Sequence, residues 1–152
     1  MPFIRRELID ATVHNIFHTI DFTDIDEWYE LAKKTLYVDE SLTNDEKSES
    51  IRILTEHYDD TKLLNNKGKK RVCDNCKQEC LATSFCELCV RNYLKANFSN
   101  WSSGNNKIDY LIQKCQMETY VSSAITEWIP YNCLQSIKYL TKGGCSEIYT
   151  AD

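Results

Sequence analysis

Two closely spaced cysteine pairs lie in the middle of this 152-residue sequence. Cys73 and Cys76 form the first pair, Cys86 and Cys89 form the second, and each pair has two residues between its thiols. This spacing lets both sulfurs of a pair reach one ion from a single turn. Two such pairs complete a tetrahedral shell of four thiolates, which suits zinc. The pattern therefore predicts one structural Zn²⁺ bound by these four residues.

A fifth cysteine, Cys80, lies between the two pairs. It could replace one of the four ligands or remain a buried thiol. Because CxxC pairs are the better chelators, we take Cys80 only as a reserve ligand. The other three cysteines are scattered, and we expect them to be core or surface residues without a metal: Cys115, Cys133 and Cys145.

Two histidines stand four residues apart in the N-terminal part, at His14 and His18. This is the spacing of the helical metalloprotease motif, but Asn15 follows His14 where that motif needs glutamate as general base. We therefore interpret the two histidines as partly exposed helix residues.

Composition places the chain among globular proteins, with 42% hydrophobic and 27% charged residues. The N-terminus shows no secretory signal, and no apolar run approaches membrane-spanning length. Paired thiols without an export signal indicate metal ligands in a reducing compartment rather than disulfides. We therefore expect a cytoplasmic location and no membrane partner.

Charge is divided unevenly along the chain. Acidic residues outnumber basic ones in residues 1–66, whereas basic residues are in excess in residues 67–152. A basic cluster at residues 67–71 could contact phosphate, but it lacks interleaved aromatic residues, so a solvated linker is the preferred interpretation. Nucleic acid is therefore not the expected partner. We expect a protein partner, and the oligomeric state stays open.

Apolar residues recur at helical spacing through the first 66 residues. Residues 23–26 and 43–46 resemble capping boxes that would begin a second and a third helix. The second cysteine pair is expected to open a further helix, and another follows residue 106. Three N-terminal helices predict a small bundle with its core at Ile16, Phe17, Ile20, Trp28, Leu36 and Leu54.

Strand-forming residues follow Pro130 near the C-terminus. Residues 137–140 and 145–151 read as two strands, and residues 142–144 read as the turn between them. The predicted fold class is therefore mainly α, with a small four-cysteine zinc knuckle of treble-clef or ribbon-like form and a C-terminal β-hairpin.

The C-terminal segment from Ile137 to Ala151 resembles the first two strands and the glycine-rich loop of a protein kinase. In kinases the pattern G-x-G-x-x-G-x-V covers the ATP phosphates with backbone N–H groups. Only one of its three glycines is retained. The candidate nucleotide-binding positions are Thr141 and Ser146 in place of the first and third glycines, Gly143 at the second, the adjacent Gly144, and Ile148 at the valine.

A wider resemblance covers most of the chain, most specifically residues 72–151. Residues 73–98, 100–105, 108–114, 127–131 and 139–144 resemble the N-terminal half of a large kinase-like family expanded in arbuscular mycorrhizal fungi, in which a cysteine-pair segment precedes the kinase domain. The resemblance implies four regions: 1–66, helical; 67–103, the four-cysteine zinc-binding segment; 104–126, a helix and linker; and 127–152, the truncated start of a protein-kinase-like N-lobe.

The residues that carry out phosphoryl transfer in a kinase would follow Ala151. They include the third-strand lysine, its helix-C glutamate and the aspartates that act as base and bind magnesium. We therefore expect a non-catalytic zinc-binding accessory or interaction module, with ATP bound only in a full-length parent. The alternatives are a kinase whose catalytic part lies outside these residues and, less favoured, an independent nucleic-acid-binding zinc module.

Overall fold

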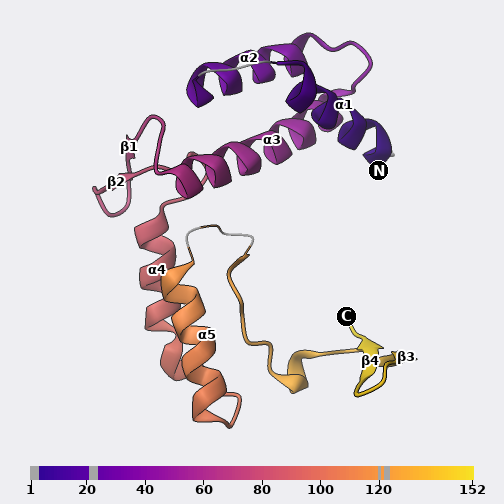
Figure 1. The fold of residues 1–152 in the computed structure, drawn as a ribbon, viewed down its shortest axis with the longest axis vertical. Coiled ribbons are helices and arrows are strands. Elements are labelled where there is room, and N and C mark those ends of the chain that lie inside the picture. The colour runs from indigo at the N-terminus through magenta and orange to yellow at the C-terminus, as the bar shows by residue number, and fades with distance from the viewer. Residues whose placement is uncertain (1–3, 21–23, 120, 122–123) are drawn as a thin grey trace. The chain divides into compact units, whose positions relative to one another are not determined.

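The structure is a computed structural model that describes residues 4–20, 24–119, 121 and 124–152. The described residues are mainly helical, with two short antiparallel strand pairs (Figure 1). They divide into two compact units. One contains the described residues up to Asn92 together with Val121, and the other contains residues 93–119 and 124–152.

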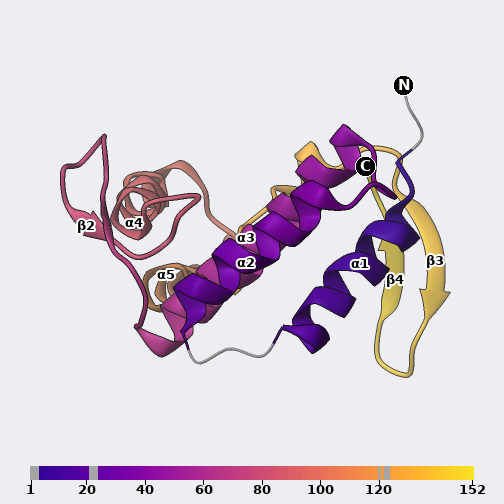
Figure 2. The ribbon, with the colours of Figure 1, turned by 90° about the horizontal axis from the view of Figure 1, so that it is seen from above.

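Three helices form the N-terminal part of the first unit. They are α1 (Arg6–Thr19), α2 (Ile25–Val38) and α3 (Asn44–Asn65). The longest, α3, packs against both of the others (Figure 2). The predicted three-helix arrangement of this region is therefore confirmed.

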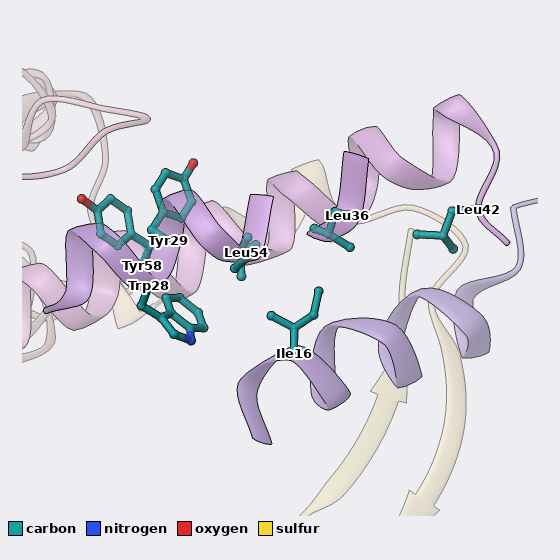
Figure 3. Close-up of a cluster of buried hydrophobic side chains, with 8 residues drawn as sticks. Ile16, Trp28, Tyr29, Leu36, Leu42, Leu54 and Tyr58 are labelled. Atoms are coloured by element: carbon teal, nitrogen blue, oxygen red, sulfur yellow. The ribbon is translucent and has the colours of Figure 1, made fainter. Parts of the chain in front are cut away.

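Aromatic and aliphatic side chains from all three helices fill the bundle core (Figure 3). Four of the predicted core residues are buried, namely Ile16, Trp28, Leu36 and Leu54, while Phe17 and Ile20 are partly buried against them. The prediction missed Tyr29, whose ring stacks on that of Tyr58 with centroids 4.0 Å apart. Its hydroxyl hydrogen-bonds the hydroxyl of Thr55 at 2.7 Å, which explains how a tyrosine is accommodated there.

The helix starts match the sequence signals with shifts of one residue at two places, since the helix expected to be capped by Asn106 is capped by Asn105. Thr43 and Glu46 form a complete capping box at the start of α3, as predicted. At α2 the N-cap is Asp24, whose carboxylate accepts hydrogen bonds from the backbone N–H groups of Asp26 and Glu27. The expected cap at Thr23 is therefore wrong by one residue, and Thr23 itself lies outside the described residues.

The capping glutamate of α3 also anchors the start of α1. Glu46 is fully buried, and its carboxylate accepts hydrogen bonds from the Arg5 guanidinium at 2.6 and 2.8 Å. The backbone N–H groups of Thr43 and Arg5 donate to the same carboxylate at 2.9 and 3.1 Å. These donors, the Arg5 side chain first, hold the pKa of Glu46 far below its usual range. One ionised carboxylate thus joins two helices.

A short strand pair and the first part of a helix follow the bundle in the same unit. Strand β1 (Arg71–Val72) pairs with β2 (Glu79–Cys80), and α4 (Glu87–Ala96) begins seven residues after β2. The chain leaves α3 through Asn66, which has a φ of 49°, and Gly68, which has a φ of 106°. A Cβ at Gly68 would lie 3.0 Å from side-chain carbons of Lys62, so this turn favours glycine for two reasons.

The second unit contains α5 (Asn106–Glu118) and the C-terminal hairpin of β3 (Lys138–Lys142) and β4 (Glu147–Thr150). Two short 3₁₀ turns, η1 (Phe98–Asn100) and η3 (Tyr131–Cys133), belong to the connections. The predicted hairpin is confirmed, but Lys142 belongs to β3 and Cys145 to the turn. The side chains of both strands are exposed.

The buried Glu46 predicts an acid-sensitive bundle. Because its pKa is lower in the folded than in the unfolded chain, its stabilising effect is fully present above the unfolded value of about 4.3 and is lost as the pH falls below it. We expect Glu46→Gln to lower stability at neutral pH and to flatten the loss of stability between about pH 5 and pH 2. Urea unfolding at several pH values measures both effects.

Glu7→Gln, at an exposed position on α1, is the matched control and should retain the acid dependence of the wild-type chain. If Glu46→Gln and the wild-type chain lost stability in parallel below pH 5, the assignment of the acid effect to Glu46 would be wrong.

Candidate metal centre

Four cysteine sulfurs converge at the start of α4. The Sγ atoms of Cys73, Cys76, Cys86 and Cys89 all lie within 4.8 Å of one another. The Cys73 and Cys89 sulfurs are 3.8 Å apart, and those of Cys76 and Cys86 are 3.6 Å apart. A tetrahedral ion with metal–sulfur bonds of about 2.3 Å places its ligand sulfurs about 3.8 Å apart. The four cysteines can therefore bind a metal ion.

The first cysteine pair lies on the tight connection between β1 and β2. The Cys73 N–H donates to the Gln78 carbonyl and the Lys77 N–H donates to the Cys73 carbonyl, each at 2.9 Å. Lys77 has a φ of 59°, the left-handed conformation that closes the turn. The backbone thus folds back on itself, and this brings both sulfurs of the pair to one side.

Backbone N–H groups in this turn point at the sulfurs. Those of Cys76 and Asn75 lower the pKa of the Cys73 thiol to about 6. At Cys76 the N–H of Gln78 acts in the same direction, but burial and the neighbouring thiols outweigh it and raise the pKa of Cys76 to about 12. Cys73 therefore ionises readily. A second thiolate beside it is disfavoured, because two negative charges would lie close together.

The second cysteine pair lies at the beginning of α4. The Cys86 carbonyl accepts the first helical hydrogen bond, from the Val90 N–H at 3.0 Å, and Cys89 lies in the first turn. The free N–H groups and the positive end of the dipole at a helix start favour thiolates. Asn75 reaches across from the first pair, and its Nδ2 donates to the Cys89 sulfur at 3.4 Å.

The reserve ligand Cys80 lies beside the four sulfurs without joining their group. It is 4% exposed, and its Sγ is 3.5 Å from the Arg71 carbonyl oxygen. Burial raises the pKa of this thiol. It does lie close to one ligand, because Cys80, Cys86 and Glu87 form a second group whose sulfur and carboxylate atoms are within 4.8 Å of one another.

The segment between β2 and α4 is held by two charged side chains near the cysteines. The Arg71 guanidinium donates to the carbonyls of Ala82 at 2.8 Å and Phe85 at 2.5 Å. The Glu87 carboxylate accepts the N–H groups of Leu81 and Ala82 at 2.8 and 2.9 Å. Backbone groups of the loop are thus bonded from both sides, and this fixes the approach of the chain to Cys86.

A single aspartate attaches this loop to the helical bundle. Asp59 of α3 is 1% exposed, and its carboxylate accepts the N–H groups of Thr83 at 2.5 Å and Ser84 at 2.9 Å and the Ser84 hydroxyl at 2.6 Å. Sequence reasoning missed Asp59, because an acidic residue on a largely polar helix gives no signal of a distant partner.

The basic cluster at residues 67–71 takes part in internal contacts. The Lys69 N–H donates to the Asp26 carboxylate at 2.9 Å, Lys70 forms an ion pair with Glu79 at 3.3 Å, and the Arg71 guanidinium is bonded to the loop. The side chains of residues 67–70 are exposed, as a solvated linker predicts, but the backbone is anchored.

The remaining cysteines and the histidines form no metal-binding group among the described residues. The rings of His14 and His18 contact each other with centroids 4.3 Å apart and are exposed, and no metal-binding group among the described residues contains a histidine. The Cys115 sulfur lies 3.5 Å from the hydroxyls of two threonines, whereas Cys133 and Cys145 are exposed.

The candidate nucleotide-binding residues all belong to the exposed C-terminal hairpin. Thr141 lies in β3 opposite Ile148 of β4, and the Gly143 N–H donates to the Ser146 carbonyl at 2.8 Å across the turn. Neither Gly143 nor the adjacent Gly144 has a positive φ. The backbone of this turn is therefore accessible to residues other than glycine.

Comparison of the chain with protein-family models, with curated proteins and with solved structures gave no match. The resemblance to a kinase-like family stays a prediction. Among the helices of the described residues, none is long and apolar enough to cross a membrane.

The Asp59 contacts predict a specific loss of stability. Asp59→Asn places an N–H₂ group among N–H donors, so we expect a decrease of about 2–3 kcal/mol in the free energy of unfolding. Urea unfolding measures this decrease, and hydrogen exchange at the Thr83 and Ser84 amides reports whether the loop has detached.

Asp60→Asn, at the next position of α3, is the matched control because Asp60 makes no such bonds to the loop. It should leave the exchange of the Thr83 and Ser84 amides unchanged. Equal effects of the two substitutions would contradict the role assigned to Asp59.

Proposed function

We propose that this chain is a non-catalytic zinc-binding accessory and interaction module, the N-terminal part of a protein-kinase-like protein. The observation that carries the zinc assignment is the convergence of four cysteine sulfurs at tetrahedral spacing. Four thiolates from two CxxC pairs form a closed structural site, without the open coordination position that a catalytic zinc needs. The ion would hold the turn of the first pair against the first turn of α4, as in a treble-clef or ribbon-like knuckle.

A structural role for the ion follows from what surrounds the cysteines. The buried cluster around the centre consists of cysteines, with Cys73, Cys80 and Cys86 at its middle and Cys76 and Cys89 packed on it. Two strands of two residues each add little by themselves. Binding of the ion would therefore supply much of the free energy that folds this segment.

The interaction role is supported by a groove next to the metal centre. It has a volume of about 590 Å³ and is formed by the end of α3, by residues 79–81 and by the first turns of α4. Four leucines line it together with charged side chains: Leu63, Leu64, Leu81 and Leu88 beside Lys70, Glu79, Glu87 and Arg91. Of the leucines, Leu64 and Leu88 are exposed. A groove with leucines beside charges of both signs suits a protein partner that offers an apolar side chain with polar neighbours better than a phosphate backbone.

The kinase-like part of the proposal is supported by the sequence resemblance and by the hairpin found at residues 138–150. Kinase and nucleic-acid alternatives differ in their ligands. A kinase would bind ATP with magnesium, whereas a nucleic-acid module needs a basic face. The Lys70 and Arg71 side chains are instead engaged within the chain.

Metal removal tests the zinc assignment. We expect elemental analysis to find one Zn²⁺ per chain, and tetrahedral thiolate absorption after replacement by Co²⁺. Structural zinc contributes about 10–16 kcal/mol of apparent binding free energy in comparable peptides, so a strong chelator should unfold the four-cysteine segment. Cys86→Ser should abolish stoichiometric zinc.

Cys80→Ser is the matched control for this experiment, because Cys80 lies outside the group of four sulfurs, and it should retain zinc. Purified protein without stoichiometric zinc would overturn the assignment. A larger loss of zinc in Cys80→Ser than in Cys86→Ser would mean that the ligand set is wrong.

Calorimetry with ATP and magnesium tests whether these residues bind the nucleotide that a kinase would need. We expect these 152 residues to show no saturable ATP binding, because Thr141 and Ser146 stand where glycines would let the backbone approach phosphates, and the hairpin side chains are exposed rather than gathered around a pocket. Phosphoryl transfer depends on positioning and charge neutralisation. Saturable binding by the zinc-loaded chain would favour the kinase alternative.

A further inference from the structure

Five cysteines surround a site that needs four ligands. Cys73, Cys76, Cys86 and Cys89 satisfy a tetrahedral ion, so Cys80 retains its own S–H when the ion is bound. Its sulfur nevertheless lies no more than 4.8 Å from the sulfur of Cys86. A free thiol beside a metal-bound thiolate has a chemical consequence that a simple structural site lacks.

We propose that Cys80 is the resolving thiol of a peroxide-sensitive metal centre, which releases its ion when Cys80 and Cys86 form a disulfide. The proposal rests on the proposed binding of zinc by the four cysteines. It adds a specific partner for one of the ligands and a class of oxidant, the hydroperoxides.

The oxidation proceeds in two steps. The Cys86 thiolate attacks the distal oxygen of a hydroperoxide and the O–O bond breaks, which gives a sulfenic acid at Cys86 and an alkoxide or hydroxide that takes up a proton. The Cys80 sulfur then displaces the hydroxyl of the sulfenic acid, which leaves as water with the Cys80 proton. Two electrons pass from the two sulfurs to the peroxide, and the S–S bond forms.

Cys80 is better suited to the second step than the ligand cysteines. The Cys76 sulfur is closer to Cys86, at 3.6 Å, but a disulfide between these two ligands would cost the ion two metal–sulfur bonds instead of one. Cys80 holds no ion, and its contact with the Arg71 carbonyl, at 3.5 Å, is a weak S–H hydrogen bond. It can therefore turn toward Cys86 at small cost.

The groove leads a small oxidant to Cys80, beside Cys86, which is itself buried. The groove of about 590 Å³ is lined by Cys80 and Glu87, the two residues that group with Cys86. The loss of Cys86 as a ligand would leave three thiolates on the ion. Since Cys86 connects the loop held by Asp59 to the start of α4, the disulfide would pull this connection toward β2 and change the wall of the groove.

The test uses the full zinc-loaded chain and hydrogen peroxide. A chromophoric chelator measures zinc release, and peptide mass spectrometry maps the disulfides. We expect release of the bound zinc together with a Cys80–Cys86 disulfide, and its recovery after a thiol reductant and fresh zinc. In Cys80→Ser, release should be slower on the order of tenfold, because the intramolecular capture of the sulfenic acid is lost.

Cys133→Ser, which removes an exposed cysteine of the other unit, is the matched control and should behave as the wild-type chain. First disulfides that join two ligand cysteines, or equal release rates in Cys80→Ser and the wild-type chain, would overturn the proposal. Disulfide mapping in the wild-type chain decides the point even if Cys80→Ser does not fold. If the zinc assignment itself is wrong, the purified chain will contain no zinc before peroxide is added. This result differs from a failure of the Cys80 proposal, in which zinc is present but the Cys80–Cys86 disulfide does not form.

Discussion

The convergence of four thiols is the constraint on which the segment between the bundle and α4 depends. In residues 71–89 the buried side chains are Cys73, Cys80, Ala82 and Cys86, and a cluster of this size excludes little apolar surface from water. Neighbouring thiols also oppose one another's ionisation, as the raised pKa of Cys76 shows. A divalent cation changes both conditions at once, because it favours the thiolates and bonds them together.

Polar contacts then transmit the position of the cysteines to the helices. Glu87 and Arg71 bond the loop before α4, and Asp59 bonds the same loop to α3. Each accepts or donates several bonds from one side chain, so the loop of residues 81–85 needs no hydrophobic core of its own. Few residues hold this loop in place, and substitutions among them should lower stability strongly. A buried carboxylate that has lost its hydrogen-bond donors destabilises the folded chain.

The features that depend on the spacing of nearby residues were predicted from the sequence. The 3.6-residue period of apolar side chains predicted the bundle and four of its buried residues, and the capping box at Thr43 predicted the start of α3. Paired cysteines predicted which sulfurs come together, because a two-residue spacing already limits the distance within each pair. The shift of the α2 cap from Thr23 to Asp24 shows the limit, since both residue types can cap and only the backbone geometry selects one.

Contacts between residues distant in sequence left no such signal. Asp59 meets Thr83 and Ser84, and Glu46 meets Arg5, only after the helices have packed. Tyr29 was missed because its ring is buried against Tyr58 while its hydroxyl still finds Thr55, a combination that hydrophobic periodicity does not report.

The placement of Cys80 is understood in the same physical terms. Its residue type alone made it a candidate ligand, but β2 pairs it with Arg71, and this register directs the thiol toward the groove rather than into the group of four sulfurs. The same register keeps it within reach of Cys86. The short pairing of β1 with β2 therefore determines whether Cys80 would compete with the four ligand cysteines for a bound ion or lie next to them. Because the turn that carries Cys73 and Cys76 joins these two strands, an ion bound to that turn would also help to hold the strand pair in place.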